Sequence, residues 1–264
     1  MADLKKQNKD PVSQIESANP WYTDNQFVQQ LGTSGRRAVI ENRWRIFEGA
    51  IARWISLNSS AVRRTPVRVV DIGCGDGVNL YGLLQIIATC EWEILLFGID
   101  YNPLRVNRVR DIDGINGLML GSIPQLPFSN ETFDLILCNH VLEHISEDAV
   151  ALKELNRILR PKGFLILGVP NEGCLLAQLR NIFVQPQIGR TTDHVQFYTP
   201  AVLAERTVSA GFRTIQMYRE GFFMPHLRVN NWLQEKTFGR AILDACRALL
   251  PSQAAGLIGI FSKS

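Results

Sequence analysis

The chain has 264 residues, of which 46% are hydrophobic and 20% are charged, and its net charge is +3 at pH 7. This length fits one large domain, or a domain with substantial insertions, and the apolar content suffices for a full core. So small a positive charge gives little support for a nucleic-acid-binding protein. No apolar run reaches the roughly 18 residues of a membrane-spanning helix. Peripheral contact with a membrane stays an open alternative.

The cysteines and the first residues bear on the cellular compartment. The 5 cysteines are widely spread, without a C-x-x-C pair. An odd, scattered set is typical of reduced thiols in a cytoplasmic protein. Residues 1–10 are polar and charged, unlike a secretory signal peptide. We therefore expect a cytoplasmic protein.

The N-terminal part is expected to be a mobile stretch, residues 1–20, followed by a helical cap, residues 21–60. Residues 36–57 predict one helix, because apolar residues recur on one broad stripe: Val39, Ile40, Trp44, Phe47, Ile51, Trp54 and Ile55. Arginines gather between residues 36 and 68, a pattern typical of a solvated helix face. Residues 59–66 are expected to be a linker.

The segment 67–88 carries the most informative pattern of the chain. A β-branched strand ends in an acid, and glycines follow it at alternate positions: Asp71, Gly73, Gly75 and Gly77. An apolar stretch with helical spacing comes next. Such a strand–turn–helix unit presents backbone N–H groups to a nucleotide-like ligand. The dinucleotide fingerprint G-x-G-x-x-G is not met, because Val78 stands at its third glycine, and a carboxylate at position 71 would repel a pyrophosphate.

A second strand, residues 94–100, ends in Asp100. An acid about 20 residues beyond the glycine loop is placed to bind ribose hydroxyls. Asp100 could also be a helix N-cap, since Asn102 and Pro103 can open a helix. Tyr101 could cover the ribose or the adenine, or be ordinary packing.

The elements that follow complete a recognisable order. A strand at 118–121 leads to a turn, the strand that begins at Phe133 leads to H-V-L-E-H, and a helix that Pro161 and Gly163 end is followed by a strand at 164–170. With the glycine loop, this order resembles class I methyltransferases that use S-adenosylmethionine (SAM), with the pattern of methyltransferase type 11. The resemblance covers residues 67–170 well and 191–215 moderately.

The resemblance implies SAM as cofactor, S-adenosylhomocysteine as its product, and a set of binding residues. Asp71 would meet the ammonium of the SAM methionine moiety, directly or through water. Relatives often carry Asp where this chain has Ser122, so Ser122 and the backbone of Ile123 would bind the adenine instead. Asn139 or His140 could line the cofactor. Arg43 or Arg45 could reach the SAM carboxylate, or form a surface ion pair.

The resemblance also implies the fold class: α/β, with a doubly wound, Rossmann-like, mostly parallel sheet of seven strands in the order 3-2-1-4-5-7-6, the last strand antiparallel. Residues 67–264 would form the SAM-binding domain, and residues 171–198 and 221–250 would be substrate-side insertions, the first a lid with a short helix at 175–183. A helix at 200–210, between Thr199-Pro200 and Gly211, follows from capping preferences. Strands are expected at 213–219 and 257–261, and a helical stretch at 227–250.

The histidines are the candidates for catalysis. A hydroxyl acceptor needs a base or a metal to remove its proton, and His144 and His194 are the candidate catalytic residues. Both could instead hold the loop and the lid in place. Residues 140–144 also spell H-x-x-E-H, the inverted zinc-peptidase motif. That motif needs an uninterrupted helix, whereas this one continues a strand, so we assign no metal ligand.

The leading hypothesis is a SAM-dependent methyltransferase with a small or medium-sized acceptor. A hydroxyl on a sugar, lipid or quinone-like molecule fits best, by analogy. Nucleic acid is not an expected partner, and the sequence does not give the oligomeric state. The alternatives are a non-catalytic SAM-fold protein that binds a partner or senses the cofactor, and an NAD-dependent oxidoreductase.

Overall fold

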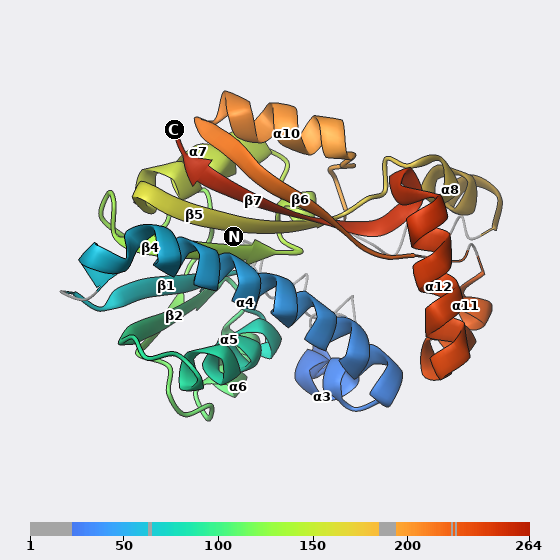
Figure 1. The fold of residues 1–264 in the computed structure, drawn as a ribbon, viewed down its shortest axis with the longest axis horizontal. Helices are drawn as coiled ribbons and strands as arrows, with labels where there is room; N and C mark the ends of the chain where they lie inside the picture. The colour runs from blue at the N-terminus through green and yellow to red at the C-terminus, as the bar shows by residue number, and fades with distance from the viewer. Residues whose placement is uncertain (1–22, 63–64, 185–193, 223, 225) are drawn as a thin grey trace, which may run out of the picture.

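The computed structural model describes residues 23–62, 65–184, 194–222, 224 and 226–264. The expected mobility of residues 1–20 and part of the expected lid lie outside the described residues. Figure 1 shows a twisted central sheet with helices on both of its faces. The strands are β1 (Val67–Ile72), β2 (Ile94–Asp100), β3 (Gly117–Leu120), β4 (Phe133–Asn139), β5 (Leu159–Pro170), β6 (Phe212–Phe222) and β7 (Ala254–Lys263).

The predicted sheet order is confirmed. The seven strands lie in the order β3-β2-β1-β4-β5-β7-β6. Strands β1 to β5 pair in parallel, and β7 runs antiparallel to both β5 and β6. The carboxyl ends of β1, β2 and β4 therefore meet at one edge of the sheet, which is where ligands bind in open α/β sheets.

The central strands of the sheet are buried on both faces. In β4, Leu135 and Leu137 pack in one core, while Ile136 and Cys138 pack in the other. This is the two-residue period of a strand covered on both sides. The helices that cover the first face are α3 (Gln26–Leu31), α4 (Ser34–Val62), α5 (Val78–Ala88) and α6 (Pro103–Val109). Those on the second face are α7 (Asp148–Ile158) and α10 (Pro200–Ser209).

The long helix α4 has the apolar stripe that the sequence predicts, with Phe47 and Ile51 almost fully buried. It is longer than predicted and has a non-helical residue at Asn58, so part of the expected linker is helical. Figure 1 shows α4 lying along the sheet and ending beside β1. The cap is therefore packed on the domain itself.

The helix α10 begins and ends where the sequence predicts. Thr199 is its N-cap and accepts a hydrogen bond from the N–H of Val202. A buried hydroxyl joins α10 to α7, because Tyr198 donates to Asp148 Oδ2 at 2.6 Å and Arg206 pairs with the same carboxylate. This contact fixes the segment that leads into α10, which includes His194.

The C-terminal insertion differs from the prediction of one helical stretch. Residues 227–250 form two helices, α11 (Leu227–Glu235) and α12 (Thr237–Leu249), because Lys236 has an extended backbone. Figure 1 shows both standing at one end of the molecule, beyond the sheet and near α8 (Leu175–Leu179). The short helix of the first insertion also differs: α8 continues as a π-helical turn, η2 (Arg180–Val184).

Candidate functional site

The glycine loop between β1 and α5 has the backbone that only glycine adopts freely. Gly73, Gly75 and Gly77 all have positive φ, at 73°, 54° and 83°, the region that L side chains avoid. The N–H groups of Gly73 and Cys74 donate to the carbonyl of Ile99, at 2.8 and 3.0 Å. The loop is therefore tied to β2. A Cβ added at Gly75 would have one near neighbour, 3.7 Å away, so a ligand can approach the backbone there.

Asp71 is an acid buried in the core, at the end of the strand that leads into the glycine loop. It is fully buried, and neither carboxylate oxygen has a hydrogen-bond partner among the described residues. Burial, and then the nearby Asp100 carboxylate, raise the pKa of Asp71 well above its ordinary value. A buried carboxylate without a partner is unfavourable unless a cation joins it. The site therefore fits a ligand with an ammonium group, as predicted for SAM.

Asp100, at the end of β2, contacts the glycine loop. Its Oδ2 accepts from the N–H of Gly75 at 2.8 Å, and its Oδ1 accepts from the N–H of Asn102 at 2.9 Å. Burial raises its pKa, against these hydrogen bonds. The alternative that Asp100 caps a helix is wrong, because Asn102 is the N-cap of α6 and accepts from Leu104. Each carboxylate oxygen keeps a lone pair for a ribose hydroxyl.

The residues expected around the adenine lie at the ends of β2 and β3. Tyr101 is 39% exposed. Ser122 is exposed in a tight turn, with its carbonyl accepting from Gln125 at 3.1 Å. Ile123 is only 5% exposed and packs in the core, so its backbone is what a base would meet. Their roles in cofactor binding stay predictions.

Two further predicted cofactor residues end β4. Asn139 is buried, and its Oδ1 has no partner among the described residues. His140 is exposed with a left-handed backbone, φ 57°. Its Nδ1 lies 3.1 Å from Glu143 Oε1, and its Nε2 lies 3.3 Å from Arg43 Nη2. Arg43 in turn pairs with Glu220 at 2.9 Å, so the alternative of an ion pair is confirmed for it, although in a mostly buried setting.

The sequence analysis missed a group of polar contacts beside the glycine loop, made by Asp76 and Arg108. Asp76, within the loop, accepts from the backbone N–H of Gln26 at 2.8 Å and from Arg108 at 3.1 Å. Arg108 also donates to the carbonyl of Thr23 at 2.6 Å. These bonds hold the start of the cap against the cofactor loop. The acid among the glycines was a visible signal, but its partners lie far away in the sequence.

The structure brings the two predicted catalytic histidines together. The rings of His144 and His194 are 4.8 Å apart between centroids and meet edge to face. His194 Nδ1 lies 2.8 Å from Glu172 Oε2, an acid that the sequence reasoning missed. The fully buried Glu143 stands beside them. Burial opposes its ionisation, but the hydrogen bond with His140 and the closeness of His140 and His144 outweigh burial, and its pKa is lowered.

A zinc-peptidase helix is absent from the described segment that carries H-x-x-E-H. Residues Leu142–His144 form a single 3-10 turn, η1, and His140 precedes it with a positive φ. The two histidines of the motif therefore do not share one helix face. The interpretation against that class of enzyme agrees with this geometry.

The thiol nearest to the site is inert. Cys74 lies in the glycine loop and is buried and free. Burial, followed by the carboxylates of Asp71 and Asp100, raises its pKa well above the ordinary value. Burial likewise raises the pKa of Cys138 in β4. Neither thiol is a candidate nucleophile.

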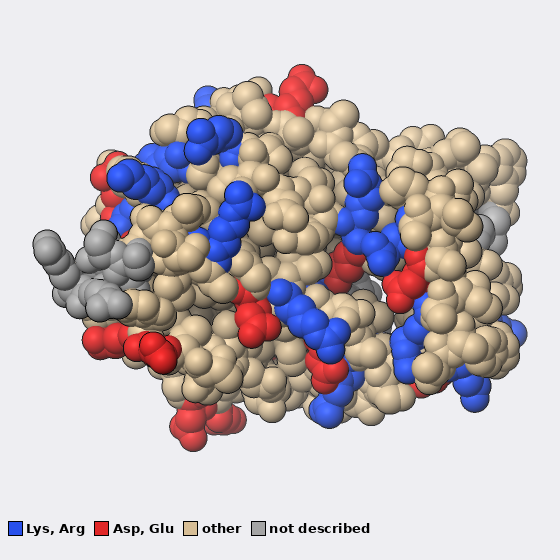
Figure 2. All heavy atoms as spheres, viewed as in Figure 1, with Lys and Arg blue, Asp and Glu red and all other residues tan. Residues whose placement is uncertain are grey.

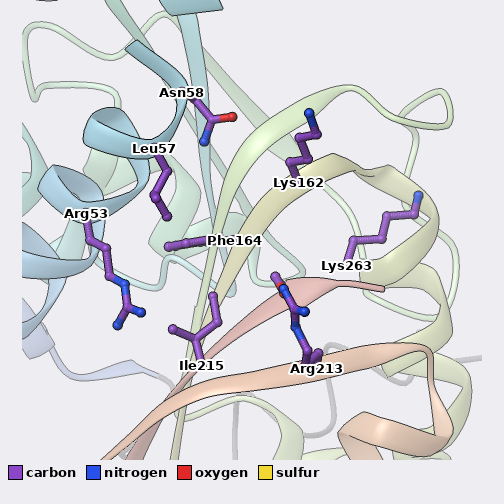
Figure 3. Close-up of a pocket in the computed structure, with 9 residues that line it drawn as sticks. Arg53, Leu57, Asn58, Lys162, Phe164, Arg213, Ile215 and Lys263 are labelled. Atoms are coloured by element: carbon purple, nitrogen blue, oxygen red, sulfur yellow. The ribbon is translucent and has the colours of Figure 1, made fainter.

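A pocket of about 290 Å³ lies at the opposite edge of the sheet, where β5 and β6 begin. Arginines and lysines gather there, as Figure 3 shows for Arg53, Lys162, Arg213 and Lys263. Figure 2 shows basic side chains near this end of the molecule and a mixture of both signs elsewhere on the same face. The pocket is separate from the edge that carries the glycine loop.

Comparison with known proteins agrees with this geometry. The family model described as methyltransferase domain matches residues 43–217, well over half of the chain. The chain is 29% identical over 190 residues to a probable S-adenosylmethionine-dependent methyltransferase of Mycobacterium tuberculosis, covering 70% of this chain and 61% of that protein. It is 24% identical over 174 residues to a ubiquinone biosynthesis O-methyltransferase of Thiobacillus denitrificans, covering 62% and 71%.

The fold has solved counterparts. The structure of an S-adenosylmethionine-dependent methyltransferase from Mesorhizobium loti matches with a TM-score of 0.54 at 15% identity, covering 78% of this chain and 97% of that one. The chain belongs to the methyltransferase-domain family, in its class I SAM-dependent form, and SAM is the cofactor of that family. It spans between 30% and 61% of the length of four curated relatives that it matches. Among the described residues, no helix has both the length and the apolar content needed to cross a membrane.

Proposed function

We propose that this chain transfers the methyl group of SAM to a hydroxyl of a small or medium-sized acceptor, such as a sugar, a lipid or a quinone-like ring. The observation that carries the proposal is the pair His144 and His194, with His194 held by Glu172 at 2.8 Å. A hydroxyl must lose its proton during the transfer, and this is the group of residues suited to promote that loss. The likeness to ubiquinone biosynthesis O-methyltransferases supports an oxygen acceptor.

The cofactor, when bound, supplies an electrophilic methyl group on a sulfonium. The chain's own residues hold the reactants. The orphaned carboxylate of Asp71 attracts the ammonium end, the backbone around Gly75 admits the nucleoside closely, and Asp100 accepts the ribose hydroxyls. In the balanced reaction, the acceptor oxygen gains the methyl group, its proton leaves, and S-adenosylhomocysteine is released as a neutral thioether.

The acceptor would lie between the cap, residues 21–60, and the insertions at 171–198 and 221–250. Support comes from α8, α11 and α12, which stand together at one end of the sheet (Figure 1). Their exposed aromatic side chains, Trp232 and Phe238, suit an acceptor with apolar parts. The mixed charges in Figure 2 give no support for a nucleic-acid partner on that face. A cytoplasmic location and possible peripheral contact with membranes stay predictions.

The test uses purified protein and SAM labelled on its methyl group. Cell extract is offered as separate small-molecule, lipid, glycan, RNA and protein fractions. We expect label in the small-molecule or lipid fraction with the wild-type chain and none with Asp71→Ala. His194→Gln should bind S-adenosylhomocysteine normally but transfer at least tenfold more slowly. Label in the RNA or protein fraction would refute the acceptor class, and binding without any transfer would favour a non-catalytic SAM-binding protein.

A further inference from the structure

We propose that Glu143, His144 and His194 form a binding site for a divalent transition-metal ion of the Zn²⁺ type. One carboxylate oxygen and one nitrogen of each histidine all lie within 4.8 Å of one another. Two histidines and one carboxylate are a known donor set for Zn²⁺ sites that keep an open position. The sequence alone predicts no such site, because its third ligand is His194 and not His140 of the H-x-x-E-H motif.

The spacing suits a site that closes around an ion. Ligand bonds of about 2.0–2.1 Å in a tetrahedron place the ligand atoms roughly 3.4 Å apart. The observed upper limit of 4.8 Å exceeds that spacing by about 1.4 Å, a difference on the scale of side-chain rotations. The backbone is already in place, since the carbonyl of Glu143 accepts from the N–H groups of Val195 and Gln196, at 2.8 and 3.1 Å. This pairing fastens the His194 segment to the turn that carries Glu143 and His144.

The buried carboxylate of Glu143 is placed to bind a cation. Glu143 is fully buried, yet its Oε2 has no hydrogen-bond partner among the described residues. Its Oε1 has only His140, at 3.1 Å. A buried charged oxygen without a partner is unfavourable, because it has lost its hydration without gaining a hydrogen bond. A metal ion bound at Oε2 would compensate for that lost hydration.

The surrounding charges favour a cation. Glu172 holds His194 Nδ1 at 2.8 Å. A carboxylate on one ring nitrogen fixes the tautomer and leaves Nε2 with the lone pair that binds metal. Glu143 and Glu172 supply negative charge to the cluster. The cation that reaches His140, Arg43, is already neutralised by Glu220 at 2.9 Å, so it offers little repulsion.

The role of the ion, although not its binding, rests on the proposed function. Three protein ligands leave a position for the acceptor hydroxyl, and a bound metal lowers the pKa of an oxygen ligand strongly. The hydroxyl proton would pass to solvent water, and the acceptor oxygen would form its new bond to the methyl carbon as the carbon–sulfur bond breaks. His144 and His194 would activate the hydroxyl through the ion.

The test is direct metal binding to the tag-free full-length chain. Zn²⁺ is titrated calorimetrically, and Co²⁺ is followed by its visible absorption. We expect one ion per chain, an affinity at least 100-fold weaker in His194→Gln, and an affinity about 10- to 100-fold weaker in Glu172→Gln, whose effect acts through His194. The matched control is His226→Gln, because His226 is exposed at the start of α11 and makes no capping bond. Its affinity should equal that of the wild type.

Binding of S-adenosylhomocysteine by each variant shows that it is folded, and keeps this test separate from the proposed function. The proposal is overturned if the wild-type chain binds no stoichiometric Zn²⁺ or Co²⁺. It is also overturned if His194→Gln, with its S-adenosylhomocysteine affinity intact, binds the metal as tightly as His226→Gln does. Methyl transfer, measured separately before and after chelation, reports on the role of the ion.

Discussion

Asp71 offers the sharpest prediction, because one substitution should raise stability and remove function together. Its carboxylate is fully buried and has no hydrogen-bond partner among the described residues. Asp71→Asn keeps the shape and removes the charge. In the cofactor-free chain we expect the free energy of unfolding to rise by about 1–3 kcal/mol at pH 7.5, because a buried carboxylate ion without a partner costs more than the neutral amide that replaces it. For a domain of this size, that is roughly 2–6 °C in Tm.

The gain in the free energy of unfolding of Asp71→Asn should increase with pH. The pKa of Asp71 is raised in the folded chain, above an ordinary value of 3.8. The folded state therefore holds this proton more tightly than the unfolded state does. The stabilisation that comes from protonated Asp71 is fully present below pH 3.8. It is lost as the pH rises through the pKa of Asp71 in the folded chain. The advantage of Asp71→Asn should accordingly be smaller at pH 5 than at pH 7.5.

The same substitution should weaken cofactor binding. Loss of a charge-assisted bond to the ammonium is worth about 1.5–3 kcal/mol, or roughly 10- to 150-fold in affinity. Urea unfolding and calorimetric titration with S-adenosylhomocysteine measure the two effects. The matched control is Asp244→Asn, an exposed acid on α12, which should change neither. A less stable Asp71→Asn variant, or one with wild-type affinity, would refute the reasoning.

Three further substitutions separate cofactor binding from structure. Asp100→Ala should weaken S-adenosylhomocysteine binding at least tenfold in calorimetry, because it loses the ribose acceptor and frees the N–H of Gly75. Asp76→Asn should destabilise the chain by about 1–3 kcal/mol in urea and make the cap more sensitive to limited proteolysis. Tyr198→Phe should cost about 1.5–3 kcal/mol in urea, the value of a hydrogen bond to a charged group, because Asp148 loses its 2.6 Å donor.

These outcomes have their own controls. Unchanged affinity in Asp100→Ala would show that the ribose assignment is wrong. For Asp76→Asn and Tyr198→Phe, Asp244→Asn is again the reference, since exposed ion pairs contribute only about 0–1 kcal/mol. Equal stability of Asp76→Asn and this reference would mean that the charge of Asp76 does not help to hold the cap. A Tyr198→Phe variant as stable as the wild type would show that Arg206 alone satisfies Asp148.

The strand order came from the resemblance to class I methyltransferases, whereas several individual elements could be predicted from local signals in the sequence. The glycines after β1 and the capping pair Thr199-Pro200 each act over a few residues. The break between α11 and α12 was not predicted, because the helical spacing of apolar residues continues across it. The break depends on Gly239, where an added Cβ would meet the backbone of Leu233. Such a close approach between two helices cannot be seen in the periodicity of either.

In the candidate site, too, some residues could be predicted from local patterns and others could not. Asp71 and Asp100 stand at the ends of predicted strands, so their meeting at one edge follows from parallel topology. The contacts of Asp76 with Gln26 and of His194 with Glu172 join segments 50 and 22 residues apart. No local pattern specifies such pairs, because they depend on how the cap and the first insertion pack on the sheet. The sequence therefore gave candidates for catalysis without their partners.

The raised pKa of Cys74 has a consequence for the enzyme itself. A protein that binds a strong methylating agent exposes its own nucleophiles to that agent, and thiolates are the most reactive of them. Burial, and the carboxylates of Asp71 and Asp100, keep this thiol protonated. The acids proposed to bind the donor thus also raise the pKa of the thiol in the same loop, which disfavours its reactive thiolate form. We therefore expect the proposed acceptor, and not Cys74, to be the methylated group.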